Sequence, residues 1–319
     1  MSTATQPIVE ASRAYESFAR RLHAVLSDHA QLMKLRVTAL VVASAWCGYF
    51  LAAHTSGVPS ISWSAWYAMA GIGLVSAGAA TLNQVIERAT DSLMFRTRHR
   101  PVAARRLSAA HAAGFGLALV IGGSAALALI ANFLTGLLAL TTAAAYLLTY
   151  TPLKQISPLC TFVGAFPGAM PPLLGWTALR GRVEWEALAL FAILFFWQFP
   201  HFLSIAWLYS EDYERASIRM LPVVDKDGRS TVRRVVIYSL ILLPVSLLPT
   251  FVGVAGAAYL IGALILSLAY SWFGWRLRNM HLSPEAAESK RPARDLLRAS
   301  ILYLPLLFAL LMLSVAFHV

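Results

Sequence analysis

The chain has 319 residues, of which 58% are hydrophobic and only 13% are charged. Soluble domains contain about 25% charged residues, so this composition excludes an ordinary soluble enzyme and indicates a protein of the lipid bilayer. The formal net charge of +11 would suit nucleic-acid binding, but the basic residues are distributed between long apolar runs, and we expect no nucleic-acid partner.

Nine apolar runs follow one another along the chain, each near the roughly 20 residues that a helix needs to cross the hydrocarbon core. They lie at about residues 37–55, 64–82, 108–131, 134–152, 159–178, 186–209, 235–254, 256–275 and 299–317. The pattern predicts an all-α fold, a polytopic membrane protein with nine transmembrane helices in one bundle.

The basic residues are divided unequally between the two sides of this bundle. Of the 26 lysines and arginines, all except Arg180 and Arg182 fall in the N-terminal tail or in even-numbered connections. The positive-inside rule therefore places the N-terminus in the cytoplasm and the C-terminus outside. We expect a cytoplasmic segment at 1–30 before a membrane domain at 31–319. The periodicity of residues 11–36 suits an amphipathic helix on the membrane surface, or a frayed tail over its start.

The connection after the second apolar run begins with the sequence NQVIERATDSLMFRTRHRP. Asn83, Glu87 and Asp91 are spaced i, i+4, i+8, so they share one face if the helix continues. Their oxygen atoms are ligands that suit Mg²⁺, and Arg96 and Arg100 can hold phosphate oxygens. The alternative is that the acids only offset arginines in a solvated loop.

A second acidic cluster follows the sixth run, in the sequence SEDYERASIRMLPVVDKDG, where Asp212 precedes Arg215. Two acid-rich helix ends on one face of a bundle can bracket a diphosphate through bridging metal ions. Lys154, in the fourth connection, is the only charged residue between positions 146 and 176 and is available to an anion. Together these residues favour a metal–diphosphate site.

His201 is the only histidine that falls well inside a predicted span. An ionisable residue in that place is costly, which suggests a function. Gln198 precedes it by one turn, on roughly the same face. The imidazole can ligate haem iron, donate to a diphosphate or transfer a proton; the alternative is a hydrogen-bonded structural histidine.

Taken together, these motifs resemble the UbiA-type intramembrane prenyltransferases, and specifically their protohaem IX farnesyltransferase (haem O synthase) branch. Most of that superfamily has aspartates where this chain has Gln84 and Glu87, and the haem branch shows the same departures. The resemblance extends over about residues 30–310. Its further motifs are Trp-Gln-x-Pro-His-Phe at 197–202, Asp-Tyr-x-x-Ala at 212–216 and Tyr-Thr-Pro-Leu-Lys at 150–154.

The chain departs from the family pattern in the turns beside these motifs. Leu35 separates Lys34 from Arg36 where a proline is usual, and Ser217 stands where a glycine is usual. Serine adopts positive φ less readily than glycine. The second departure therefore concerns the turn of the second acidic loop.

The resemblance implies a nine-helix bundle around a central cavity, capped by the two polar loops. It implies transfer of the farnesyl group of farnesyl diphosphate to a vinyl group of haem B, giving haem O and diphosphate, with Mg²⁺ as cofactor. The implied catalytic residues are Asn83, Glu87, Asp91, Asp212 and His201. The same set without His201 would bind metal; Arg96, Arg100, Lys154 and Arg215 would bind diphosphate; His201, Gln198, Trp197 and Tyr213 would contact haem.

Such an enzyme would supply respiratory oxidases and could meet the next enzyme of haem A synthesis. We expect it in the plasma or inner membrane, with its active site facing the cytoplasm, since no Arg/Ser-rich transit segment precedes the first span.

One alternative is a UbiA-type enzyme with a quinone or chlorophyll-type acceptor, which Glu87 and the Trp-Gln-x-Pro-His run disfavour. A transporter is disfavoured because the polar residues cluster at one face of the bundle and no inverted repeat is present.

Overall fold

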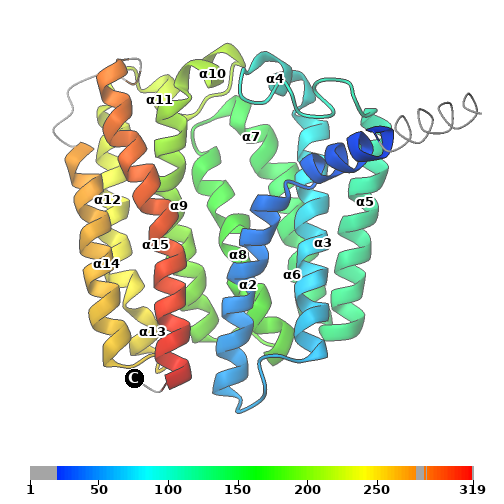
Figure 1. Cartoon of the computed structure of the whole chain (residues 1–319). Helices are drawn as coiled ribbons and strands as arrows, with labels where there is room; N and C mark the ends of the chain where they lie inside the picture. The colour runs from blue at the N-terminus through cyan, green and yellow to red at the C-terminus, as the bar shows by residue number, and fades with distance from the viewer. Residues whose placement is uncertain (1–19, 278–283, 285, 318–319) are drawn as a thin grey trace, which may run out of the picture.

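The computed structural model describes residues 20–277, 284 and 286–317, and these residues form helices without a strand among them. The elements in chain order are α2 (Leu35–Thr55), α3 (Trp63–Ile86), α4 (Arg88–Leu93), α5 (Ala109–Ala126), η1 (Leu127–Ala131), α6 (Phe133–Ala144), η2 (Ala145–Tyr150), α7 (Thr151–Ile156), α8 (Cys160–Arg180), α9 (Trp185–Leu208), α10 (Ser210–Arg215), α11 (Leu221–Val224), α12 (Arg229–Ser246), α13 (Leu248–Phe251), α14 (Ala257–Arg276), η4 (Ala287–Ser289) and α15 (Lys290–Phe317). The long helices stand side by side in one bundle (Figure 1).

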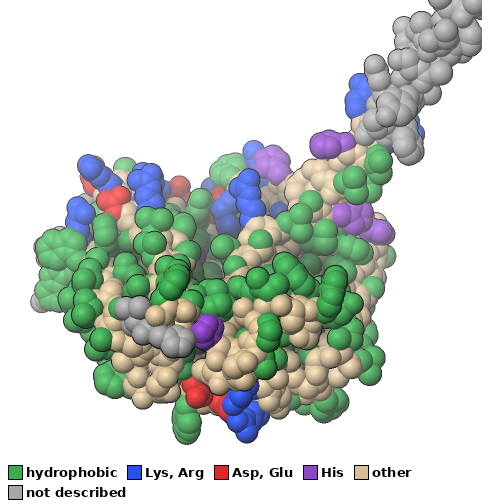
Figure 2. Space-filling model, turned by 60° about the horizontal axis from the view of Figure 1, so that its bottom comes forward, with side chains coloured by type: hydrophobic (Ala, Val, Ile, Leu, Met, Phe, Trp, Pro, Cys, Tyr) green, Lys and Arg blue, Asp and Glu red, His purple; other side chains and the backbone are tan. Residues whose placement is uncertain are grey.

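Eight helical stretches within the described ranges are long and apolar enough to cross a membrane. The helix α8 has 21 residues and packs against α2 and α9, but it is not among the eight. Apolar side chains cover the sides of the bundle, while charged ones gather at its ends (Figure 2). The predicted all-α, multi-pass membrane fold is confirmed; the nine-span count, the orientation of the termini and the central cavity stay predictions.

Polar side chains cap the N-termini of two of the long helices. The Ser62 hydroxyl accepts a hydrogen bond from the amide of Ala65 at the start of α3, and Asn132 accepts one from Thr135 at the start of α6. Each cap satisfies an amide that has no partner within its helix. These starts agree with the apolar runs in the sequence to within two residues.

Glycines allow α2 and α8 to pack backbone against backbone. A Cβ atom added at Gly175 would overlap the carbonyl oxygen of Ala45, and one added at Gly48 would overlap that of Pro172. Small residues at such crossings are typical of membrane bundles, because they replace side-chain bulk by close backbone contact. This crossing joins the two large apolar clusters of the core, since α2 and α8 contribute to both.

The short helices α4, α10 and α11 lie at one end of the bundle, which we call the polar end, and α15 finishes at the opposite end (Figure 1). Residues 20–32 are helical and lie across the polar end before a turn leads into α2. Exposed Leu22, Val25 and Leu26 share one face of this helix, as in an amphipathic helix. Residues 1–19 are outside the described residues, so the predicted segment 1–30 and its membrane contact stay predictions.

Candidate active site

The first acidic motif lies at a break between two helices, so the continuous helix that the shared face assumed is not present. Asn83 belongs to α3, Glu87 stands at the break with φ −85° and ψ 4°, and Asp91 belongs to α4. The amide of Glu87 still donates to the carbonyl of Asn83 at 2.9 Å, and that of Asp91 to the carbonyl of Glu87 at 2.8 Å. The hydrogen bonds between residues i and i−4 that are typical of an α-helix therefore continue through the break.

Two carboxylates of this motif share one cation. Arg100 Nη1 donates to both carboxylate oxygens of Asp91 at 2.8 and 2.7 Å, and lies 3.9 Å from Glu87 Oε2. Lys154 Nζ donates to Glu87 Oε1 at 2.6 Å. Asp91 is fully buried and Glu87 is 9% exposed. The carboxylates converge on a position that a cation occupies, so the donor set fits a hard divalent ion such as Mg²⁺.

Lys34 is a residue of this cluster that was missed in the sequence. Its Nζ donates to Asn83 Oδ1 at 3.1 Å, and its backbone has a left-handed φ of 46°. The side-chain amide of Gln84 donates to the carbonyls of Gln31 and Leu32 at 3.1 and 2.9 Å and so holds the turn that presents Lys34. The sequence feature that could have identified Lys34 is its position directly before the first span, where the family pattern also has a lysine.

Burial and neighbouring charges both shift the pKa values of the ionisable groups of the cluster. Burial, followed by the charges of Arg100 and Lys154, lowers the pKa of Lys34 to about 7. Burial alone would raise the pKa of Glu87, but Lys154 and the other cations lower it below its usual value. Burial raises the pKa of Asp91, although Arg100 opposes the change. The carboxylates therefore depend on the cations around them for their charge.

If the cluster binds the farnesyl diphosphate that the family resemblance implies, replacing Lys34 should change how the use of that substrate depends on pH. The lysine loses its charge as the pH rises through about 7, so kcat/KM for the diphosphate should fall above that pH in the unaltered protein. Lys34→Arg keeps the charge and should remove the fall. Lys34→Met should lower kcat/KM roughly 10–100-fold below pH 7, the value of one charge-assisted hydrogen bond.

The measurement is kcat/KM from about pH 6 to 9 with farnesyl diphosphate varied. Lys290→Arg is the matched control and should keep the unaltered profile, because Lys290 pairs with exposed Glu211 and with none of Asn83, Glu87 and Asp91. A Lys34→Arg profile that still falls above pH 7 would contradict a role for Lys34 in holding the diphosphate.

Asp212 fastens the second acidic loop to the first. Its two carboxylate oxygens accept hydrogen bonds from the amides of Phe95 and Arg96, each at 3.2 Å, and Arg215 Nη1 donates to it at 2.6 Å. No group of three or more His, Cys, Asp and Glu side chains suited to a metal occurs in the part of the chain that the structure describes. Asp212 thus connects the two acidic loops. That it also binds a metal ion stays a prediction.

The remaining basic residues of the site pack on aromatic rings. Arg96 lies over the Tyr209 ring at 5.1 Å and donates to the Tyr213 hydroxyl at 3.3 Å. Lys154 Nζ lies 4.4 Å from the centre of the Tyr150 ring, and Arg215 lies 4.1 Å from that of Phe95. Such contacts hold cations in place while leaving hydrogen-bond donors for an anion. Tyr213, predicted to contact haem, is thus bound into the loops.

Ser217 takes the conformation that the usual glycine would take. It has φ 54° and follows α10, where the amide of Ile218 donates to the carbonyl of Tyr213 at 2.8 Å. This is the bond pattern of a helix end that favours glycine. The turn is therefore retained with serine, at a conformational cost of roughly 1–2 kcal/mol.

Ser217→Gly should stabilise the protein by up to about 1 kcal/mol, because relief of the left-handed strain exceeds the entropy that glycine loses on folding. Ser217→Val should destabilise it, since a β-branched residue is the least tolerant of positive φ. Thermal unfolding in detergent measures both. The expectation fails if glycine and valine change the melting temperature in the same direction.

Two of the three predicted haem-contacting residues of α9 lie together, and the third faces another helix. The rings of Trp197 and His201 are stacked with centroids 4.6 Å apart, and His201 Nδ1 is 2.7 Å from the Ser300 hydroxyl. Gln198 is instead buried against α8, where its amide donates to the carbonyl of Ala165 at 3.2 Å. Gln198 faces α8 and His201 faces α15. The two are only three positions apart, so a helical wheel places them on nearly the same face and does not show that their neighbours differ.

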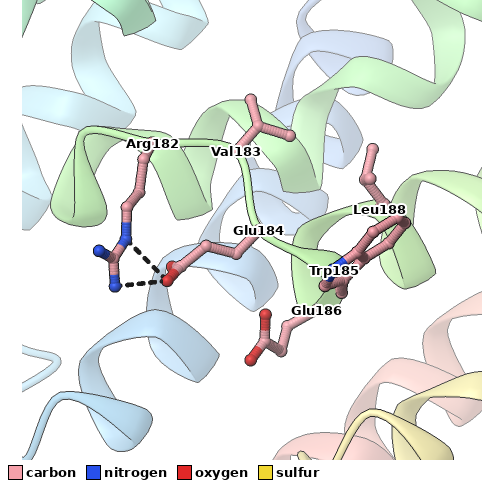
Figure 3. A pocket seen from close by; sticks show the side chains of 6 residues that line it. All are labelled: Arg182, Val183, Glu184, Trp185, Glu186 and Leu188. Atoms are coloured by element: carbon pink, nitrogen blue, oxygen red, sulfur yellow. Dashed lines mark hydrogen bonds and ion pairs between the residues drawn. The ribbon is translucent and has the colours of Figure 1, made fainter.

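A pocket of about 490 Å³ lies at the opposite end of the bundle and includes none of the predicted site residues (Figure 3). Its lining includes Arg182, Glu184 and Trp185. Glu184 accepts from Arg182 Nε at 2.8 Å, from Arg180 Nε at 2.8 Å and from Trp176 Nε1 at 2.9 Å. These bonds hold the α8–α9 connection in place, and we assign them no chemistry.

The chain is similar to proteins of one family. Residues 40–291 match the model of the UbiA prenyltransferase family. The protoheme IX farnesyltransferase of Koribacter versatilis is 52% identical over 98% of this chain and 99% of its own length. The protein of that name from Solibacter usitatus is 44% identical over 91% of this chain and 99% of its own length.

Solved structures share the fold at low sequence identity. A structure of digeranylgeranylglyceryl phosphate synthase has a TM-score of 0.74 at 15% identity, covering 91% of this chain and 98% of that one. A UbiA homologue from Archaeoglobus fulgidus bound to GPP and Mg²⁺ has a TM-score of 0.57 at 16% identity, covering 89% and 99%. The family predicted from the motifs is confirmed: this chain belongs to the UbiA prenyltransferase family.

Proposed function

We propose that this protein is a protohaem IX farnesyltransferase, which joins the farnesyl group of farnesyl diphosphate to a vinyl group of haem B with addition of one water molecule, and gives haem O and diphosphate. The observation that carries the proposal is the buried meeting of Asn83, Glu87 and Asp91 with basic side chains at the polar end. The relatives of that name, matched over nearly their whole length, support haem as the acceptor.

The basic side chains of the site would bind the diphosphate. Arg100 and Lys154 pair with acids of the cluster in the structure, and Lys34 donates to the side-chain oxygen of Asn83. Each of these cations can transfer its hydrogen bonds to phosphate oxygens. Arg96 would close the site from the loop that Asp212 holds. Positioned cations stabilise the negative charge that grows on the diphosphate as its bond to the farnesyl carbon breaks.

Release of those cations to the substrate would leave the first acidic motif free for a metal ion. Asn83, Glu87 and Asp91 would hold Mg²⁺, and Asp212 is the further candidate. When bound, the ion would neutralise charge on the leaving diphosphate. Mg²⁺ bound with a prenyl diphosphate in an Archaeoglobus fulgidus homologue supports this choice of cofactor.

We place the active site at the cytoplasmic face of the plasma or inner membrane. In the predicted topology all but two of the lysines and arginines belong to the tail and connections on this side, and the positive-inside rule assigns such a side to the cytoplasm. Haem and the apolar farnesyl chain would both reach the site from the bilayer. The next enzyme of haem A synthesis would then meet the product in the same membrane.

The test is farnesyl transfer by the purified protein in detergent, with haem B, farnesyl diphosphate and Mg²⁺, and with the product identified by mass spectrometry. A farnesyl–haem adduct that disappears with EDTA and returns with Mg²⁺ is the expected result. Prenylation of a hydroxybenzoate without any haem adduct would replace the proposal by the aromatic-acceptor alternative.

A further inference from the structure

One serine of α15 contacts both aromatic residues of the Trp-Gln-x-Pro-His motif. Ser300 is fully buried, and its hydroxyl lies 2.7 Å from His201 Nδ1. Its carbonyl oxygen accepts a hydrogen bond from Trp197 Nε1 at 2.9 Å. Because the two rings are also stacked on each other, Ser300 anchors a Trp197–His201 pair from one position on a different helix.

The hydrogen bonds of Ser300 determine which nitrogen of His201 carries the proton. A hydroxyl has a single proton to donate, and the Ser300 hydroxyl donates it to the carbonyl of Leu297 at 2.6 Å. A carbonyl oxygen can only accept, so this arrangement favours His201 Nδ1 as the donor to the Ser300 hydroxyl. In a neutral imidazole the other nitrogen, Nε2, is then left with a free lone pair.

That second nitrogen is available to a ligand. Nε2 of His201 makes no hydrogen bond to any residue that the structure describes, and the side chain is partly exposed. His201 lies seven positions before Leu208 at the end of α9, which is about 10 Å along the helix. The free lone pair therefore lies within the candidate span Trp185–Leu208, roughly two turns from the loop that carries Asp212.

We propose that Ser300 is a positioning residue that holds His201 in its Nδ1–H form, so that Nε2 ligates the iron of the haem substrate. The proposal rests on haem B as the acceptor in the proposed function. A histidine that binds a metal commonly donates its other N–H to a fixed acceptor, which sets the ring orientation and raises the basicity of the ligating nitrogen. Ser300 provides that acceptor, and stacking on Trp197 fixes the ring plane.

The experiment is a titration of the purified, detergent-solubilised protein with ferric haem B in the absence of farnesyl diphosphate. Absorption and electron paramagnetic resonance spectra report histidine ligation, and the titration gives the Kd. Loss of an acceptor of this kind typically weakens metal binding 10–100-fold, so Ser300→Ala should raise the Kd by about that factor. Ser300→Thr retains the hydroxyl and should keep the histidine-ligated spectrum, while His201→Ala should lose it.

Ser204→Ala is the matched control. Ser204 is also buried, and its hydroxyl donates to the carbonyl of Pro200 at 2.7 Å, the same type of bond within a helix, but to no histidine. It should bind haem as the unaltered protein does. If Ser300→Ala does not accumulate in the membrane, Ser300→Cys keeps the volume and supplies a much weaker acceptor.

An unchanged Kd and spectrum in Ser300→Ala would overturn the positioning role, as would a wild-type haem spectrum without histidine ligation. Neither result depends on turnover. A protein that makes haem O but shows no histidine ligation refutes this inference and leaves the proposed function intact. A protein that binds haem through His201 but makes no haem O would refute the proposed function alone.

Discussion

Asp91→Asn is expected to lower farnesyl transfer by about 10²–10³-fold, the loss that follows removal of one preorganised electrostatic group from an active site. The substitution preserves shape and removes one negative charge. Arg100 then loses the carboxylate that receives its two shortest hydrogen bonds, at 2.8 and 2.7 Å. The nearest remaining acid is Glu87, 3.9 Å from the same nitrogen. Both metal binding and the placement of Arg100 should suffer.

Glu214→Gln is the matched control for Asp91→Asn. Glu214 is also ion-paired, with Lys226 at 2.7 Å, but both side chains are more than half exposed, and such pairs contribute little. Steady-state kcat and thermal unfolding should be measured for both variants. Near-normal turnover in folded Asp91→Asn protein would refute the assignment of Asp91 to the reaction. An equal loss in Glu214→Gln would show that the effect is one of general surface charge.

Gly175→Ala should be the most damaging methyl addition in the bundle. The new carbon would overlap the backbone oxygen of Ala45 on α2, and backbone atoms cannot rotate away as the end of a side chain can. Overpacking in a well-packed interior costs about 1–3 kcal/mol, occasionally more. Because α2 and α8 join both core clusters, separation at this crossing should also lower the yield of folded protein.

Gly122→Ala is the control, since a Cβ atom at Gly122 in α5 meets nothing within 4 Å. Alanine there should be neutral or stabilising by about 0.5–1 kcal/mol, because glycine is a poor helix residue. The melting temperatures of both variants in the same detergent test the contrast. Gly175→Ala protein as stable as Gly122→Ala protein would show that α2 and α8 separate at little cost.

The fold was accessible from the sequence because the bilayer imposes a strong pattern. Hydrocarbon thickness requires long apolar runs, and the predicted runs overlap the long helices of the described residues. The apolar pattern could not show the break at Glu87, because backbone hydrogen bonds continue through it and the side chains keep their spacing. It likewise carries no information on which neighbour each face of α9 meets, which is why Gln198 was grouped with His201.

Contacts between charged side chains of the candidate site were predictable from the sequence. Contacts between a side chain and backbone amides were not. Glu87, Asp91 and Arg100 were identified by type and spacing, and they do meet. Asp212 bonds to the amides of Phe95 and Arg96, which no residue pattern encodes. Lys34 and Ser300 were not predicted as site residues, because their partners, Asn83 and His201, lie 49 and 99 residues away.

The turn that presents Lys34 has a practical consequence for handling the protein. Gln84 bonds directly to the end of the helix at 20–32, and Lys34 follows two residues later. An affinity tag, a fused reporter or a surface attachment that displaces this helix would therefore also displace Lys34 and its contact with Asn83. The end of α15 lies at the other end of the bundle (Figure 1), which makes it the better place to attach a label.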